Sequence, residues 1–336
     1  MSVLVTGGAG YIGSHTVRLL VERGVDVVVL DTLEFGHRAA VPDTPVVVGD
    51  ICDGALVARV VDDYRVDSVI HFAGYKAAGE SMVRPERYFD NNVARSAAFL
   101  AAVRDAGVWR VVFSSSCSVY GSPRTLPVGE DHPTGPESPY GASKLMVEQM
   151  LHWYGVAHGL AWVSLRYFNA AGAAADARIG EDATVSLNLV PLAMRAALGR
   201  VPALRVFGAD YPTPDGTAIR DYVHVVDLAD AHVRALRYLR EGGESTVVNL
   251  GTGRGSSVLE VVAAARRASG VDFRVDLVDR RPGDPVAVYA DNARAGGLLG
   301  WQPAYELDEI VASAWRWHST HPDGYATVAS PHESAA

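Results

Sequence analysis

The chain has 336 residues, of which 49% are hydrophobic and 21% charged, and this is typical of a folded protein with room for about two domains. Its formal net charge of −9 argues against nucleic acid or an anionic membrane surface as a partner, because like charges repel. Two cysteines are too few for a disulfide framework, and no segment has the pattern of a signal peptide or a membrane span. We therefore expect a cytoplasmic protein.

Short apolar runs alternate with helical patterns along the first half of the chain. The runs predict strands over Val3–Thr6, Val25–Leu30, Val46–Val48, Ser68–Phe72, Arg110–Ser114 and Ala161–Tyr167. The patterns between them predict helices over Ser14–Arg23, Gly54–Tyr64, Glu86–Ala106 and Tyr140–His158. This alternation is typical of an α/β protein with a doubly wound parallel (Rossmann) sheet.

The pattern changes after Asn169, where a loop of small residues precedes a helix predicted at about Leu189–Leu198. We therefore predict a Rossmann domain over residues 1–170 and a smaller C-terminal α/β domain over residues 171–336. The segment Tyr222–Val226 reads as a strand that could return to the first sheet, so we expect an interleaved boundary.

A glycine turn lies between the first predicted strand and the first predicted helix. Glycines in a G-x-x-G-x-x-G spacing permit a tight turn and let backbone N–H groups approach a pyrophosphate at the helix N-terminus. The cofactor-contacting positions predicted in this turn are Gly7, Gly10, Tyr11, Ile12 and Gly13.

Acidic residues follow the next two strands. Asp31 ends the second strand, where a carboxylate would accept hydrogen bonds from ribose hydroxyls and repel a 2′-phosphate. This favours NAD over NADP as the cofactor. Asp50 and Ile51 follow the third strand and are candidate adenine contacts.

Tyr140 and Lys144 lie four residues apart on a predicted helix and so share one of its faces. The lysine ammonium and a bound nicotinamide cation would both lower the tyrosine pKa, so that the phenolate could take a hydroxyl proton. Ser114–Ser116 ends the fifth strand, where the ligand crevice of such a sheet is expected. By itself this serine run could also be an ordinary polar strand end.

Seven motifs follow one another in a characteristic order: Gly7–Gly13, Phe72–Lys76, Phe113–Ser116 with Val119–Gly121, Tyr140–Lys144, Arg166–Asn169, Arg220–Val225 and Arg280–Asp284. Together they resemble the extended short-chain dehydrogenase/reductase family and, within it, the UDP-glucose 4-epimerases. The resemblance covers about residues 1–325. It implies that the first domain binds NAD and the second a nucleotide sugar.

The resemblance also implies roles for individual residues. Tyr140 would be the catalytic base, Ser116 would bridge Tyr140 and the sugar O4, and Lys144 would hold the nicotinamide ribose. Further cofactor contacts are implied for Phe72, Ala73, Lys76, Asn92, Ser114 and Tyr167. Contacts with the nucleotide sugar are implied for Lys76, Phe168, Asn169, Asn188, Leu189, Phe207, Arg220, Arg281, Asp284 and Val288.

The implied activity is NAD-dependent C4 epimerisation of UDP-hexoses through a 4-keto sugar, in a homodimer formed through the helices at about Glu86–Ala106 and Tyr140–His158. The substrates would be UDP-glucose and UDP-galactose. Val288 stands where the family has a gate beside the sugar C2 substituent, which extends the expectation to UDP-N-acetylglucosamine and UDP-N-acetylgalactosamine.

Two alternatives stay open. Nucleotide-sugar 4,6-dehydratases resemble one another in acidic residues after the serine or threonine, whereas Cys117 and Ser118 stand there in this chain. A non-catalytic NAD-binding sensor on the same fold would have no need of Ser116, Tyr140 and Lys144 together. A metal hydrolase is not expected, because the histidines lack paired-ligand spacing.

Overall fold

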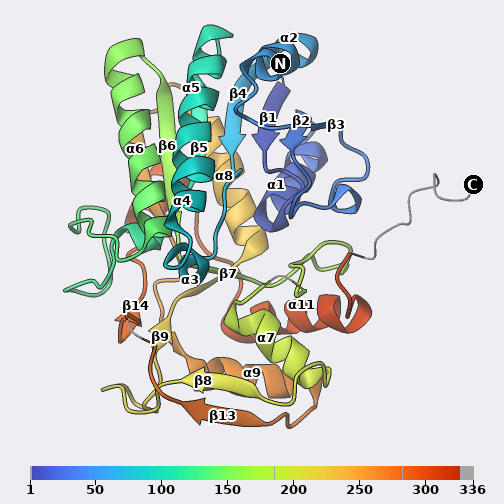
Figure 1. The fold of residues 1–336 in the computed structure, drawn as a ribbon, viewed down its shortest axis with the longest axis vertical. Helices are drawn as coiled ribbons and strands as arrows, with labels where there is room; N and C mark the ends of the chain where they lie inside the picture. The colour runs from blue at the N-terminus through green and yellow to red at the C-terminus, as the bar shows by residue number, and fades with distance from the viewer. Residues whose placement is uncertain (1, 185, 282, 326–336) are drawn as a thin grey trace, which may run out of the picture.

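The computed structural model of the protein describes residues 2–184, 186–281 and 283–325 (Figure 1). The last part of the predicted C-terminal domain, residues 326–336, lies outside the described residues. No helix within the described ranges has both the length and the apolar character needed to cross a bilayer.

In this part of the chain the largest sheet has seven strands in the order β11-β6-β5-β4-β1-β2-β3 (Figure 1). Its strands are β1 (Ser2–Thr6), β2 (Asp26–Asp31), β3 (Val46–Val48), β4 (Val66–His71), β5 (Arg110–Ser116), β6 (Ala161–Tyr167) and β11 (Thr246–Leu250). Every pairing in it is parallel. The predicted doubly wound sheet is therefore confirmed, and each predicted strand forms within two residues of its expected bounds.

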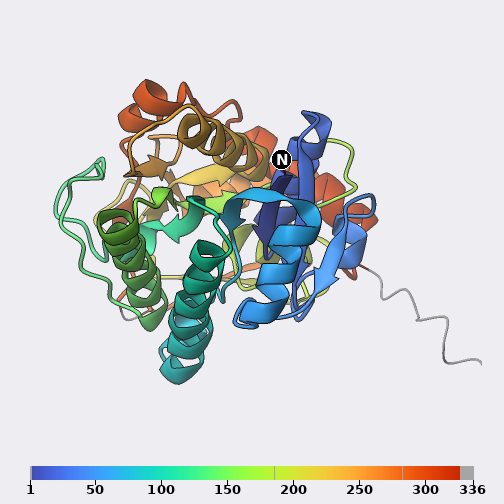
Figure 2. The ribbon, with the colours of Figure 1, turned by 90° about the horizontal axis from the view of Figure 1, so that it is seen from above.

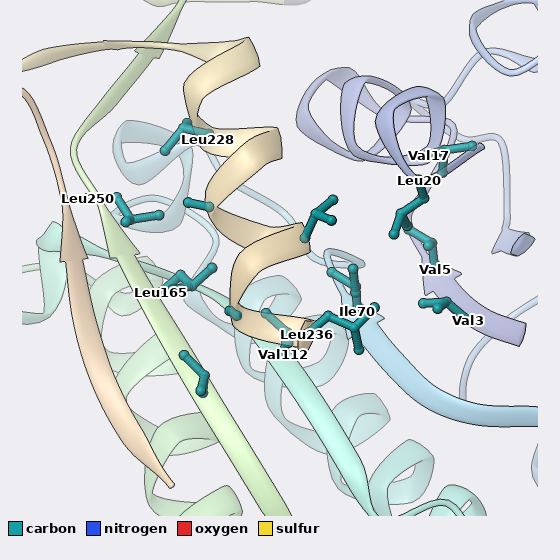
Figure 3. Packing of buried hydrophobic residues seen from close by; sticks show 14 of the residues in the cluster. Val3, Val5, Val17, Leu20, Ile70, Val112, Leu165, Leu228, Leu236 and Leu250 are labelled. Carbon is teal, nitrogen blue, oxygen red and sulfur yellow. The ribbon is translucent and has the colours of Figure 1, made fainter. Parts of the chain in front are cut away.

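Helices cover both faces of this sheet (Figures 1 and 2). One face packs against α1 (Tyr11–Glu22) and α8 (Val225–Arg240), and Figure 3 shows Val5, Ile70 and Leu165 of the sheet pointing toward Leu20 and Leu236 of these helices. The other face packs against α2 (Gly54–Tyr64), α5 (Arg95–Asp105) and α6 (Pro139–His158). Strands buried on both faces explain why Val, Ile and Leu fill them without alternation.

The helix predicted over Glu86–Ala106 is interrupted by a wider turn. It consists of α4 (Pro85–Tyr88), a π-helical segment η2 (Phe89–Ala94) and α5, and it follows the short helix α3 (Ala78–Ser81). A π-turn changes the direction in which the following side chains point, and such turns occur often at functional sites. Here it contains the buried Asn92.

The remaining elements form a second layer below the carboxyl end of the large sheet (Figure 1). Strands β8 (Leu204–Phe207) and β13 (Val275–Val278) pair in parallel, and α7 (Leu189–Ala197), α9 (Val258–Ser269) and α11 (Leu307–Thr320) share one apolar core. Short strands form two further small sheets, β10-β7 and β12-β9-β14: β7 (Asn169–Ala171), β9 (Ile219–Arg220), β10 (Tyr222–His224), β12 (Ser256–Ser257) and β14 (Ala287–Val288). Short helices complete the set: η1 (Arg38–Ala40), η3 (Cys117–Val119) and α10 (Ala293–Leu299).

The segment that returns to the large sheet is not Tyr222–Val226. Tyr222–His224 pairs in parallel with Asn169–Ala171, in a separate two-stranded sheet. The chain re-enters through α8, which packs on the sheet, and then through β11, which adds the edge strand beside β6. The position beside β6 is taken by Thr246–Leu250, which pairs along β6 for five residues, whereas Tyr222–His224 finds its partner in β7. The boundary at residue 170 stays a prediction.

Candidate active site at the carboxyl edge of the sheet

The glycine turn joins β1 to α1, and the backbone of Gly10 forms the N-cap of that helix. Gly7 has a φ of +68°, and a Cβ at this position would lie 2.7 Å from the backbone nitrogen of Ala73. A Cβ on Gly13 would lie 2.4 Å from the Gly7 carbonyl oxygen. The turn therefore needs glycine at both positions, and with no acidic residue in the first turn of α1 its free N–H groups suit a pyrophosphate.

The side chains within the turn have structural partners. The Tyr11 hydroxyl donates to the Gly172 carbonyl at 2.6 Å, and Ile12 packs against the core under α1. Phe72 and Ala73, at the end of β4, run beside the turn: Ala73 N donates to the Thr6 carbonyl at 3.1 Å. These positions can offer a cofactor backbone groups, apolar contact and, at Tyr11, a hydroxyl oxygen that can still accept a hydrogen bond.

Asp31 lies at the carboxyl end of β2 and is 8% exposed. Its carboxylate accepts hydrogen bonds from the backbone nitrogens of Ala9, at 3.0 Å, and Leu33, at 2.9 Å. Burial raises the pKa of Asp31, and these two donors oppose that rise. A carboxylate has about four acceptor positions, so two remain for ribose hydroxyls.

The other two residues predicted near the adenine are already engaged within the protein. Asp50 accepts from the backbone nitrogen of Cys52 at 2.9 Å and pairs with the Arg95 guanidinium. Burial opposes ionisation of Asp50, but these donors outweigh it and lower the pKa. Ile51 is 7% exposed and packs in the core behind the sheet.

Ser116, Tyr140 and Lys144 meet at the carboxyl end of β5. Lys144 is 5% exposed, its Nζ donates to the Ser114 carbonyl at 2.9 Å, and it lies 6.0 Å from the Tyr140 ring centroid. Burial lowers the pKa of Lys144 to about 8, against the field of Glu148.

The expected lowering of the Tyr140 pKa does not occur in the protein by itself. Burial raises the pKa of Tyr140 to about 12, and the Ser116 hydroxyl opposes this rise. The prediction considered charges alone, whereas removing a phenolate from water is the larger effect at this depth. The Lys144 ammonium is also held by Ser114 rather than by the phenol oxygen.

Asn92 is hydrogen-bonded to residues on two sides of the cluster formed by Ser116, Tyr140 and Lys144. Its amide oxygen accepts from the backbone nitrogen of Tyr75 at 2.8 Å, and its amide nitrogen donates to Ser143 Oγ, beside Lys144, at 3.0 Å. Asn92 thus links the segment after β4 to α6. Close by, the hydroxyls of Ser114 and Tyr167, at the ends of β5 and β6, hydrogen-bond to each other.

Some of the residues predicted for the nucleotide sugar lie at or near the pairing of β9 and β14. Arg220 Nη2 lies 3.3 Å from the Asp284 carboxylate, and Arg220 pairs in register with Val288. Phe168 and Val288, 5% and 6% exposed, pack in one apolar cluster. Asn169 Nδ2 donates to the Asp221 carbonyl at 3.0 Å.

A second pair lies at the end of β8, where the Arg281 guanidinium stacks 3.8 Å from the Phe207 ring centroid. Arg281 is exposed, as a diphosphate clamp would need to be. Leu189 begins α7, and Asn188 is its N-cap residue.

The structure reveals one residue that the sequence analysis missed. Glu181 is 3% exposed and accepts from both Lys76 Nζ, at 2.8 Å, and Asn188 Nδ2, at 3.0 Å. Lys76 was expected to contact both the cofactor and the nucleotide sugar, and Asn188 only the nucleotide sugar, so one carboxylate links residues of the two expected sites. No local pattern marks Glu181, because Lys76 is 105 residues away in the chain.

Among the described residues, no group of three or more His, Cys, Asp and Glu side chains could hold a metal ion. The strand order and the polar cluster at the carboxyl edge are those of a class of α/β enzymes. Enzymes of this class bind a dinucleotide at the first strand–helix turn and their substrate next to that dinucleotide. Comparison with known proteins then gives the family. The chain belongs to the NAD dependent epimerase/dehydratase family, whose model matches residues 3–251.

Relatives of nearly equal length support this assignment. The chain is 50% identical to a UDP-glucose 4-epimerase of Azospirillum brasilense, over 99% of this chain and 97% of the relative. A UDP-glucose 4-epimerase of Brucella ovis, solved in complex with NAD, superposes with a TM-score of 0.92 at 48% identity, covering 94% of this chain and 97% of that one. The enzyme from Bifidobacterium longum, solved with NAD+ and UDP, gives a TM-score of 0.92 at 41% identity and covers 97% and 100%.

Proposed function

We propose that this protein interconverts UDP-glucose and UDP-galactose by NAD-dependent inversion at C4. The observation that carries the proposal is the meeting of Ser116, Tyr140 and Lys144 beside the glycine turn, in a chain whose full-length relatives are UDP-glucose 4-epimerases. The glycine turn and Asp31 fit NAD, because the turn leaves a side-chain-free cradle and Asp31 keeps acceptor positions for a ribose.

Each of the proposed site residues has a role that follows from the chemistry of its side chain. When bound, NAD supplies the acceptor and then the donor of the hydride at C4. Tyr140 takes the proton from the 4-hydroxyl and returns it, and Ser116 hydrogen-bonds the same oxygen. Arg220 and Arg281 hold the diphosphate as guanidinium forks while the sugar presents its opposite face.

The test is conversion of UDP-galactose to UDP-glucose by the purified protein with no added NAD. Tyr140→Phe should lower turnover by about 10²–10⁴-fold, as expected for loss of a general base, while leaving NAD bound. Absence of conversion by the parent protein would overturn the proposed function. Conversion by Tyr140→Phe at the parent rate would overturn only the role of Tyr140.

The half-buried Cys117 disfavours the 4,6-dehydratase alternative. Elimination of water needs an acid and a base near C5 and C6, and Cys117 and Ser118 occupy the positions at which acidic residues were expected for it. Burial raises the pKa of the Cys117 thiol to about 12, so the thiol stays neutral and is a poor proton donor or acceptor near pH 7.

The proposal extends to N-acetylated sugars. Val288 is a small residue that packs with Phe168 in one apolar cluster, whereas the ring of Tyr289 lies beside Gly255. Neighbouring residues of a strand point to opposite faces, so Tyr289 cannot supply the missing bulk. Space beside the sugar C2 position is then left for an acetamido group.

The protein is also proposed to form a homodimer through α5 and α6. Large apolar side chains are exposed along one side of α6: Met146 by 40%, Trp153 by 64% and Val156 by 65%. Residues seven and three apart share a helix face, so these three form one stripe. Such a stripe is typical of a surface that a second copy covers.

A further inference from the structure

Glu181 lies in the connection between β7 and α7, and its side chain is 4% exposed. A single carboxylate oxygen, Oε1, accepts three hydrogen bonds: from Lys76 Nζ at 2.8 Å, from Ser186 Oγ at 2.7 Å and from Asn188 Nδ2 at 3.0 Å. A buried carboxylate is costly unless it is compensated by donors of this kind. Glu181 therefore orders the side chains that surround it.

The position of Glu181 is set by packing that does not involve its carboxylate. Trp317, which is fully buried on α11, donates from Nε1 to the Glu181 carbonyl at 2.9 Å. A Cβ on the preceding Gly180 would lie 2.4 Å from the Trp317 ring, so the backbone runs directly against the indole. The anchor thus belongs to the second layer of the molecule, whereas Lys76 belongs to the first.

Two of the residues that donate to Glu181, Lys76 and Asn188, lie beside the proposed sites of two different ligands. Lys76 follows β4 and its Nζ lies 5.8 Å from the ring centroid of Tyr11, in the glycine turn. Asn188 lies at the N-cap of α7, in the segment proposed to bind the nucleotide sugar. An ammonium has three N–H donors, so Lys76 can stay bonded to Glu181 while another donor meets a phosphate oxygen.

We propose that Glu181 is a positioning residue that couples binding of the dinucleotide to binding of the nucleotide sugar, by holding Lys76 and Asn188 on one buried oxygen. The inference rests on the proposed function and adds to it a link between its two sites. Coupling between sites is reciprocal in binding free energy, so each ligand should strengthen retention of the other. A purely structural role for Glu181 would change stability without changing this link.

The experiment uses the protein as purified with its NAD, and UDP as the second ligand. NAD retained per chain is measured after exhaustive dialysis with and without UDP, which requires no turnover. In the parent protein UDP should increase NAD retention. In Glu181→Gln, which keeps the shape but removes the charge, UDP should lose most of this effect, and the KM for UDP-galactose should rise more than kcat falls.

Asp176→Asn is the matched control, because Asp176 lies on the same connection and pairs with Arg18 at 2.9 Å between two exposed side chains. That variant should behave as the parent in both assays. Thermal unfolding of each variant separates lost coupling from lost fold. An equal effect of UDP on NAD retention in the parent and in Glu181→Gln overturns the proposal, and so does a parent that shows no effect of UDP.

If Glu181→Gln fails to fold, Asn188→Ala gives the same answer, since Asn188 is exposed and its removal leaves no cavity. Weaker NAD retention in Asn188→Ala in the presence of UDP is expected, although Asn188 is proposed to touch only the nucleotide sugar. Retention equal to the parent overturns the coupling. A parent protein that binds NAD and UDP with this link but converts no UDP-galactose would overturn the proposed function and leave the role of Glu181 standing.

Discussion

Burial decides the protonation of the catalytic candidates residue by residue. The same low-dielectric surroundings raise the pKa of Tyr140 to about 12 and lower that of Lys144 to about 8. Both shifts favour the neutral form, as expected where charged groups lose contact with water. Near pH 7 a pKa of about 12 keeps the Tyr140 phenol protonated, whereas a pKa of about 8 leaves most of the Lys144 ammonium charged. Tyr140 therefore needs a bound ligand to lower its pKa before it can act as a base.

We propose that one residue, Val288, sets the substrate range. Val288→Tyr should lower kcat/KM for UDP-N-acetylgalactosamine relative to UDP-galactose by about 10- to 200-fold, which is what one lost pocket contact can discriminate. Steady-state kinetics on both substrates measures this ratio. Tyr289→Val is the matched control, since its side chain points to the other face of β14 and the ratio should not change. A parent protein inactive on N-acetylated sugars would show that Val288 is not the gate.

At the scale of elements, buried polar contacts attach α6, which carries Tyr140 and Lys144, to β5 and β6. Glu148 lies one turn after Lys144, pairs with Arg166 of β6 and accepts from Ser115 of β5. Arg166 also donates to the Tyr120 hydroxyl at 3.0 Å. Helix and strands thus hold Ser116, Tyr140 and Lys144 at one relative position.

Removing one member of this buried pair should be strongly destabilising. Arg166→Met leaves the Glu148 carboxylate without its guanidinium, and we expect a loss of about 3–5 kcal/mol in the free energy of unfolding. Urea denaturation measures the change. Arg237→Met is the control, because Arg237 and Glu241 are 65% and 70% exposed and lie 3.8 Å apart; this variant should change stability by less than about 1 kcal/mol. If both variants lose the same free energy of unfolding, the buried pair of Glu148 and Arg166 does not stabilise the fold more than an exposed ion pair does.

At the scale of the whole molecule, buried histidines make stability depend on pH. Burial lowers the pKa of five of them, to about 3 or about 4: His15, His71, His224, His232 and His318. Each folded-state pKa lies below the unfolded value of about 6.5, so the unfolded chain takes up protons first as the pH falls.

Stability should therefore fall as the pH drops from about 6.5 toward about 4, by about 1.4 kcal/mol per pH unit for each such histidine. Urea denaturation at several pH values measures the slope. His232→Phe should lower the slope of the unfolding free energy against pH by the amount expected for about one proton taken up on unfolding. Substitution of the exposed His152 should leave the slope unchanged. A slope unchanged in His232→Phe would show that this histidine is not buried neutral.

The assembly is the other whole-molecule property. Trp153→Glu places a charge in the apolar stripe of α6 and should convert the proposed dimer to a monomer, because an unpaired charge cannot be buried cheaply. Sedimentation velocity at micromolar concentration measures the mass. Val21→Glu, at a 45% exposed position on α1, is the control and should leave the mass unchanged. A monomeric parent would contradict the dimer.

The sequence by itself determined six of the seven strands of the large sheet, the glycine turn and the Tyr140–Lys144 face of α6, because each depends on residues close together in the chain. Periodicity predicts a strand or a helix, and a spacing of four predicts a shared helix face. Even Asp31 was placed correctly at the end of β2, since strand ends follow from where an apolar run stops.

Only the tertiary structure decided the rest. That β11 rather than Tyr222–Val226 completes the sheet depends on which strand can pair along β6, and that pairing spans about 80 residues of chain. The raised pKa of Tyr140 depends on burial, which no sequence spacing reports. Glu181 reaches Lys76 across 105 residues. A contact of that separation leaves no periodic pattern, because it is made by the packing of two layers and not by the chain between them.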